Sequence, residues 1–231
     1  MKQPDRNQSW HQDPEVLFLD NHLLAVNKPA GLATHEDGVH EVTLRSWAEQ
    51  YLVDKLQKKG RAFVVPVHRL DRLTSGVVLF AKTDKALSRM MEAFRSRRVQ
   101  KSYRACVEGV VKPSLGRWED GIIRKESQSY IVGPNQEGSD LAILEYECIK
   151  EYEGKSYCHI NLLTGRHHQI RAQFASRGHS IVGDRKYGSS IDLGQKIMLH
   201  HAKLEVPHPI NGQILSFKAP LPLFWPSFCK D

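Results

Sequence analysis

Two short apolar runs, Val64–Val67 and Val77–Phe80, flank a charged segment, His68–Gly76, with the sequence HRLDRLTSG. Apolar runs of this length, bounded by Thr, Ser and Gly, are typical of β-strands joined by a loop. The pattern therefore predicts that Asp71 lies on a loop held between two strands. The arginines on either side favour its ionised form, because nearby positive charge stabilises a carboxylate. Loops on rigid flanks often carry function, but a lone Asp among arginines is more often a salt-bridged surface residue.

Further pairs of short apolar runs, each joined across a turn sequence, predict antiparallel hairpins. The pairs are Val16–Leu19 with Leu23–Val26 across Asp20-Asn21, Leu144–Cys148 with Tyr157–Leu163 across Glu153-Gly154, and Lys203–Val206 with Ile214–Phe217 across Asn211-Gly212. Alternation around Tyr103 predicts one more strand, with Tyr103 on its apolar face. In contrast, Lys112–Asp140 is rich in Gly, Pro, Ser and charge, and predicts irregular connections with at most short strands near Ile122 and Tyr130.

Helical spacing of apolar residues predicts two helices early in the chain, Thr43–Lys58 with Thr43 as N-cap, and Asp84–Arg97. From Lys85 to Arg104, the second helix and its exit carry seven cations and one acid. Such a surface is either a solvated face or one that follows phosphates. The cations are Lys85, Arg89, Arg95, Arg97, Arg98, Lys101 and Arg104, against Glu92.

A third helix is expected over His167–Arg177, ending at Gly178. In that helix His168, Arg171 and Ala175 share one face, while the apolar residues share another. Arg171 would then point away from the core and be available to a carboxylate.

The chain has 231 residues, enough for one catalytic domain with a full core, and a net charge of +7, with 33 Lys and Arg against 26 Asp and Glu. This balance favours a polyanionic partner. We expect residues 1–14 to be a disordered lead-in, because they are polar and contain Pro4 and Pro14, and residues 15–231 to be the folded domain. The lead-in lacks the apolar core of a signal peptide, and no apolar run approaches membrane-spanning length. We expect a soluble, cytoplasmic protein.

The four cysteines, Cys106, Cys148, Cys158 and Cys229, have no close paired spacing. This argues against a disulfide framework and a Cys-rich zinc site, and favours reduced thiols. The adjacent histidines at 167 and 168 lack the i,i+4 spacing of helix-borne zinc ligands, so no metal is expected. The chain contains neither a Walker A sequence nor a dinucleotide fingerprint, so no nucleotide cofactor is indicated.

Five segments together resemble the RluA-type pseudouridine synthases. His68–Gly76 is similar to the HRLDxxTSG signature of that family, and the five segments occur in the family's order. The other four are Val26–Gly31, Lys101–Ala105, Thr164–Arg171 and Gly183–Gly188, and the resemblance covers about residues 15–222.

The resemblance implies an α+β fold: a mixed, mainly antiparallel β-sheet with flanking helices and a central catalytic cleft. It implies an isomerase that converts uridine to pseudouridine in ribosomal or transfer RNA, with no cofactor. Asp71 would be the catalytic carboxylate, either as a nucleophile at the sugar or as a base at its 2′ carbon. Tyr103 would stack on the target base and assist proton transfer, and Arg171 would pair with Asp71.

The target base lies within a stacked nucleic acid, so such an enzyme extrudes the nucleotide, and Arg69 resembles the family arginine that helps displace it. Lys28, in the turn after the second apolar run, is either a substrate contact or a solvated residue. The residues expected to bind RNA are Lys28, Arg69, Arg72, Arg95, Arg97, Arg98, Lys101, Arg166 and His168. The resemblance also implies a monomer.

Two departures from the family are visible. The lead-in is too short for the small RNA-binding S4 domain of many relatives, so the expectation is a stand-alone catalytic domain. His201 stands where the family has a small residue, which affects local packing. The alternatives are a catalytically silent RNA-binding protein of the same fold, a glycoside hydrolase, and a structural protein of an RNA assembly. A hydrolase usually needs two carboxylates, and the signature has one.

Overall fold

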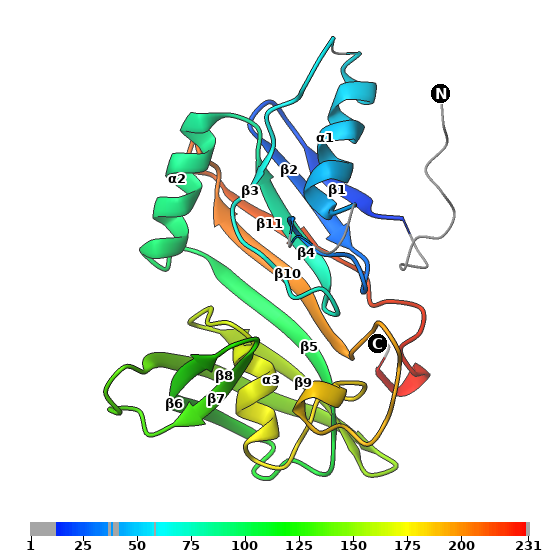
Figure 1. The fold of residues 1–231 in the computed structure, drawn as a ribbon, viewed down its shortest axis with the longest axis vertical. Helices are drawn as coiled ribbons and strands as arrows, with labels where there is room; N and C mark the ends of the chain where they lie inside the picture. The colour runs from blue at the N-terminus through cyan, green and yellow to red at the C-terminus, as the bar shows by residue number, and fades with distance from the viewer. Residues whose placement is uncertain (1–12, 37, 39–41, 58, 230–231) are drawn as a thin grey trace.

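The protein is described here by a computed structural model, which covers residues 13–36, 38, 42–57 and 59–229. Most of the expected lead-in, residues 1–12, lies outside the described residues. Within them, eleven strands form one sheet in the order β1-β2-β4-β10-β5-β9-β8-β6-β7, with β11 paired to β10 and β3 to β4 (Figure 1). The strands are β1 (Glu15–Leu19), β2 (Leu23–Lys28), β3 (Val65–Pro66), β4 (Ser75–Ala81), β5 (Gln100–Glu108), β6 (Leu115–Lys125), β7 (Gln128–Val132), β8 (Asp140–Tyr152), β9 (Lys155–Leu162), β10 (Leu199–Pro207) and β11 (Ile214–Lys218).

The α-helices are α1 (Leu44–Lys55), α2 (Asp84–Arg95) and α3 (Gln169–Ala175), and the 3-10 turns are η1 (Arg185–Tyr187) and η2 (Ser227–Cys229). All strand pairs are antiparallel except β10 with β4, which run parallel. The predicted mixed, mainly antiparallel sheet with flanking helices is therefore confirmed, as are the three predicted hairpins. None of the described helices is long and apolar enough to cross a membrane.

Helices α1 and α2 cover opposite faces of β2 and β4. Successive strand residues point to opposite faces, and the two sets of buried side chains divide accordingly. Leu24 and Phe80 pack with α1 in one core, whereas Leu23 and Leu79 pack with α2 in another. Thr43 caps α1 as expected, because its hydroxyl accepts from the amide of Ser46.

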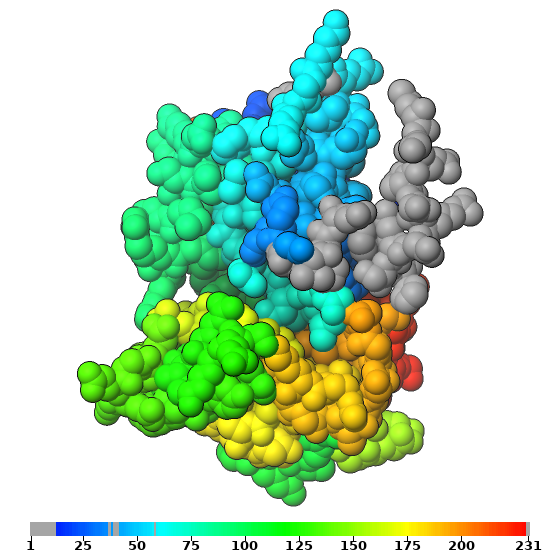
Figure 2. All heavy atoms as spheres, in the orientation of Figure 1, coloured from blue at the N-terminus to red at the C-terminus, as the bar shows by residue number. Residues whose placement is uncertain are grey.

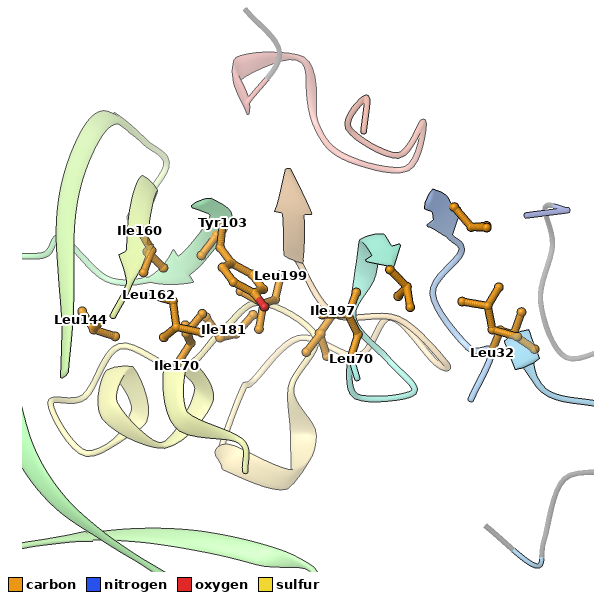
Figure 3. Close-up of a cluster of buried hydrophobic side chains, with 14 of the residues drawn as sticks. Leu32, Leu70, Tyr103, Leu144, Ile160, Leu162, Ile170, Ile181, Ile197 and Leu199 are labelled. Carbon is orange, nitrogen blue, oxygen red and sulfur yellow. The ribbon is translucent and has the colours of Figure 1, made fainter. Parts of the chain in front are cut away.

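Helix α3 packs on the same side as α1, over the half of the sheet formed by β5, β8 and β9. Ile170 and Phe174 enter the α1 core together with Tyr103 from β5. Figure 3 shows Tyr103 near Ile170 and Leu162, with its hydroxyl oxygen in red. This core therefore runs beneath both halves of the molecule and includes a residue of predicted catalytic importance.

A short strand near Tyr130 is present as β7, but the expectation that Lys112–Asp140 is otherwise mostly irregular, with at most a short strand near Ile122, is wrong. β6 is eleven residues long and pairs with both β7 and β8. Charged residues alternate along its exposed face, which masks the strand pattern in the sequence. The third helix is also shorter than expected, because His168 has a left-handed backbone (φ 52°) and acts as the N-cap.

The expectation that all four cysteines are reduced is also wrong. Cys148 and Cys158 face each other across β8 and β9 and form a disulfide. Strand pairing places them opposite each other despite a sequence separation of ten residues. Cys106 and Cys229 are free and buried.

Candidate active site

The Asp71 loop, residues 67–74, connects β3 to β4 and is held on both sides of Asp71. On one side, Thr34 Oγ1 accepts from the amide of Leu70 at 3.2 Å and donates to its carbonyl at 2.9 Å. On the other side, the amide of Gly31 donates to the carbonyl of Arg72 at 2.8 Å. The predicted strand, loop and strand around Asp71 is confirmed, and its backbone is fixed by the segment after β2.

Lys28 does not lie where a phosphate contact requires it. Its side chain is fully buried, and Nζ donates to the carbonyls of Pro29, Leu32 and Arg72 at 3.0, 2.8 and 3.1 Å. Burial lowers the pKa of Lys28 to about 7. Three carbonyls need three donors, which the ammonium supplies. The structure thus makes Lys28 a support for the Asp71 loop, and we remove it from the set of RNA-binding residues.

Arg171, on α3, joins Asp71 to a second carboxylate. Nη1 donates to Asp71 Oδ2 at 3.0 Å, while Nε and Nη2 donate to the two oxygens of Asp184 at 2.6 and 2.9 Å. The guanidinium carbon also lies 4.9 Å from the centroid of the Tyr187 ring. Arg171 is therefore turned towards Asp71, as its position on the helix predicted, and the two residues are 100 positions apart in the sequence.

The electrostatics keep Asp71 ionised. Burial by itself raises the pKa of Asp71. His168 and Arg171 lower the pKa by more than burial raises it, so the net pKa is below its usual value. Burial also lowers the pKa of His168 to about 3, despite the nearby carboxylate, so His168 is neutral at neutral pH. The positive charge that stabilises the Asp71 carboxylate at neutral pH is therefore that of Arg171. His168 Nε2 lies 3.6 Å from Asp71 Oδ2.

A pocket of about 200 Å³ opens over Asp71. Its apolar floor includes Tyr103, Leu162 and Leu199, and Figure 3 shows these three side chains in one region. Burial, with a smaller effect from the Asp71 charge, raises the pKa of the Tyr103 hydroxyl, which is therefore protonated at neutral pH. The pocket thus combines a carboxylate, a phenol and a flat apolar surface.

Cations surround this pocket. Arg69 and Arg166 line it and are exposed, and Arg166 also pairs with Asp140 at 3.2 Å. Lys101, on β5, reaches the rim of the pocket at Gly165. A Cβ added to Gly165 would lie 3.4 Å from the Nζ of Lys101. The space-filling view shows the blue-to-cyan half and the green-to-orange half meeting across the visible face (Figure 2).

The other predicted cations lie further out. Arg95, Arg97 and Arg98 are exposed at the end of α2, although Arg95 is paired with Glu92. Arg72 is partly exposed on the Asp71 loop. The end of α2 leads directly into β5 and Lys101, so these cations extend away from the pocket rim.

Sequence reasoning missed three residues of the site. Asp184 is buried and orients Arg171. The Tyr187 hydroxyl forms a hydrogen bond of 3.0 Å with His168 Nδ1. Both lie in the Gly183–Gly188 segment, whose resemblance to the family implies no role for either residue. Arg124, near the end of β6, which is longer than expected, also lines the pocket.

The described residues contain no group of three or more His, Cys, Asp or Glu arranged to hold a metal ion. The chemistry available to the pocket is that of one ionised carboxylate beside a fixed guanidinium. Such a carboxylate can attack an electrophilic carbon or remove a proton from carbon. The protonated phenol can donate a hydrogen bond or relay a proton.

Comparison with known proteins decides the family. A family model described as RNA pseudouridylate synthase matches residues 22–176. The chain belongs to this family. The tRNA pseudouridine synthase C of Pasteurella multocida (strain Pm70) is 34% identical over 235 residues, covering 91% of this chain and 93% of that protein. The ribosomal large subunit pseudouridine synthase D of Zymomonas mobilis subsp. mobilis (strain ATCC 31821 / ZM4 / CP4) is 33% identical over 236 residues, covering 96% of this chain and 74% of that protein.

The pseudouridine synthase fold is also seen in a solved structure. The human RNA pseudouridylate synthase domain containing 4 superposes with a TM-score of 0.77 at 22% identity, covering 91% of this chain and 89% of that one. The α+β fold class implied by the sequence is therefore confirmed, and the enzyme class of the family is isomerase.

Proposed function

We propose that this protein isomerises uridine to pseudouridine in ribosomal or transfer RNA, with Asp71 as the catalytic carboxylate. The observation that carries the proposal is the Asp71–Arg171 pair at 3.0 Å, at the base of a pocket that also contains Tyr103. The relatives described above are named for both kinds of RNA, so both remain candidate substrates.

The reaction breaks the bond between C1′ and N1 of uridine, turns the uracil, and joins its C5 to C1′. C5 loses a proton and N1 gains one, so the atoms balance without an oxidant or a second substrate. The Asp71 carboxylate acts either as a nucleophile at C1′ or as a base at the 2′ carbon. Arg171 keeps it deprotonated in both cases.

Tyr103 offers a flat ring on which the extruded uracil stacks. Because its hydroxyl is protonated at neutral pH, Tyr103 can take the C5 proton only if its own proton is passed on. Arg69 and Arg166, exposed at the pocket, bind the phosphates beside the target nucleotide. His168 lies beside Asp71 and contacts the sugar end of the pocket as a neutral ring.

The cations beyond the rim bind RNA further from the target. Arg72, Arg95, Arg97 and Arg98 follow a phosphate backbone outward from the pocket, and Lys101 binds it at the rim. The protein acts on this RNA as a monomer, as the family resemblance implies. Replacing Arg97 and Arg98 with Glu should weaken RNA binding and reduce its salt dependence, whereas the same change at exposed Lys150, on β8, is the matched control.

The decisive experiment maps pseudouridine in total RNA from cells with and without the gene, complemented by wild-type or Asp71→Ala protein. A site that is lost in the deletion, restored by the wild type and not by Asp71→Ala supports the proposal and identifies the substrate. If the Asp71→Ala protein restores the site, Asp71 is not catalytic. If purified wild-type protein binds RNA from the deletion strain but forms no pseudouridine, the protein is a silent RNA-binding member of the fold.

A further inference from the structure

His201 and Tyr103 lie face to face on neighbouring strands. They are direct partners in the pairing of β10 with β5, and their ring centroids are 4.5 Å apart with 17° between the ring planes. His201 is fully buried, whereas Tyr103 borders the catalytic pocket. The imidazole therefore covers one face of the Tyr103 ring from inside the protein.

The imidazole is held in a single orientation. Its Nδ1 lies 2.7 Å from the carbonyl oxygen of Val77, and a carbonyl only accepts, so Nδ1 carries the hydrogen. Burial lowers the pKa of His201 well below its usual value, so the ring is neutral and Nε2 has no hydrogen. Among the described residues, Nε2 has no hydrogen-bond partner. A buried nitrogen without a partner opposes folding, so packing alone does not account for a histidine here.

The backbone of His201 packs closely against Gly76 and cannot shift towards it. A Cβ added to Gly76, on the parallel neighbour β4, would come within 2.3 Å of the carbonyl oxygen of His201. Gly76 has φ +117°, which a residue with a side chain rarely adopts. The backbones of β10 and β4 are therefore in close contact at His201. This contact fixes the backbone position from which the imidazole extends behind Tyr103.

His201 also contacts the residue that begins the charged signature. The His68 ring meets it edge-on at 5.5 Å between centroids, and His68 in turn stacks on Phe94 of α2 at 5.2 Å. His68 Nε2 accepts from the amide of Leu79, which fixes that ring too. One imidazole thus connects the Tyr103 ring to the loop that carries Asp71.

We propose that His201 is a positioning residue that sets the plane of the Tyr103 ring, and with it the orientation of the stacked uracil relative to Asp71. This inference rests on the proposed function. A small residue at position 201 would leave space behind Tyr103, and the ring could tilt away from the pocket. In this chain a second neutral ring fills that space and stacks on Tyr103 without adding a charge beside it.

The test uses single-turnover kinetics with enzyme in excess over total RNA from cells lacking the gene, labelled with tritium at uracil C5. Pseudouridine formation releases the C5 hydrogen, so tritium reports the reaction, whereas release of free uracil would not. Three variants separate the properties of His201. His201→Ala removes the ring, His201→Phe keeps a flat ring without the donor, and His201→Asn keeps a donor for Val77 without the ring.

His200 supplies the matched control. It is the adjacent residue of β10 and equally buried, but its side chain contacts Ser75 and the carbonyl of Ala219 on the opposite side of the strand. His200→Ala therefore measures the general effect of removing a buried imidazole from this strand. Thermal unfolding of every variant gives the folded fraction, and folded enzyme is kept at a saturating concentration so that the rate constant does not depend on that fraction.

We expect His201→Ala to lower the rate constant about 10- to 100-fold, because small misplacements of a reacting group have effects of this size. The dissociation constant for the same RNA, measured by filter binding, should change less than about threefold, since phosphate contacts dominate it. His201→Phe should recover most of the rate and His201→Asn should not. His200→Ala should keep the wild-type rate constant.

Three outcomes overturn the inference: an unchanged rate constant in His201→Ala, recovery by Asn but not by Phe, or an equal loss in His200→Ala. If wild-type protein itself releases no tritium, the proposed function fails, and the inference fails with it. These outcomes are distinguishable, because the first three require an active wild type.

Discussion

Asp184 accepts two hydrogen bonds from Arg171, at 2.6 Å from Nε and 2.9 Å from Nη2. Only 4% of the Arg171 side chain and none of the Asp184 side chain is exposed. This bidentate contact occupies one edge of the guanidinium and leaves Nη1 for Asp71. The orientation of the guanidinium that holds the Asp71 carboxylate is therefore set by a residue outside the HRLDRLTSG segment.

Replacing Asp184 with Asn should weaken both the fold and the reaction. One partner of a buried ion pair would be lost, so we expect the free energy of unfolding to fall by about 3–5 kcal/mol, measured by urea denaturation. Single-turnover tritium release should slow as Arg171 loses its orientation. Asp120→Asn is the control. Asp120 forms an ion pair with Arg177, with 2.9 Å between Oδ1 and Nη2, and this pair lies outside the pocket. A rate loss no greater than in that control would contradict the role given to Asp184.

The pH dependence of the reaction should reveal Arg171. In the wild type the pKa of Asp71 lies below its usual 3.8, so the carboxylate persists as the pH falls to that value. Arg171 lowers the pKa of Asp71 through both its charge and its hydrogen bond, so removing it raises that pKa. In the double variant Arg171→Gln, Asp184→Asn, the rate should therefore begin to fall at a higher pH than in the wild type. Single-turnover rates from pH 4.5 to 8 test this, and identical acid limbs would count against the assignment.

Lys28→Met should destabilise the protein without changing how RNA binding responds to salt. Three buried carbonyls would lose their donor, and we expect about 2–4 kcal/mol less free energy of unfolding. Because Nζ faces inward, the slope of log affinity against log salt should not change. Lys101→Met, at the rim, should reduce that slope by about one. A reduced slope in Lys28→Met would return Lys28 to the RNA-binding residues.

Thiol counting should distinguish two classes of cysteine. Protein denatured under non-reducing conditions should react with iodoacetamide at Cys106 and Cys229 alone, because Cys148 and Cys158 are joined. Prior reduction should bring the number of labelled cysteines to four. Peptide mass spectrometry locates the labels. Four labels without a reductant would show that the β8–β9 thiols are free in the isolated protein.

The sequence predicted the parts of the site that depend on local patterns. The strand, loop and strand around Asp71 follows from two apolar runs and a polar segment, and the direction of Arg171 follows from helical spacing relative to Ile170 and Phe174. Both inferences use only neighbours along the chain, and both are confirmed.

Features that depend on distant contacts could not be predicted in the same way. In the sequence Lys28 resembles a solvated turn residue. Its hydrogen bond to the carbonyl of Arg72, 44 positions away, forms only in the folded protein. Asp184 and His201 act through partners that tertiary folding supplies. The β8–β9 disulfide needs the strand register, and the long strand β6 is hidden because its exposed face is charged.

The place of β10 in the sheet has a consequence for how the protein is made. β10 inserts between β4 and β5, which precede it by more than ninety residues. It supplies Leu199 to the pocket and His201 to the inner face of the Tyr103 ring. Until residues 199–207 have been synthesised, the emerging chain holds two halves of a sheet with the strand between them missing. Contacts this distant in sequence form late and slowly. Asp71 and Tyr103 therefore reach their working geometry only after nearly all of the described chain has left the ribosome, and a nascent chain should not modify RNA.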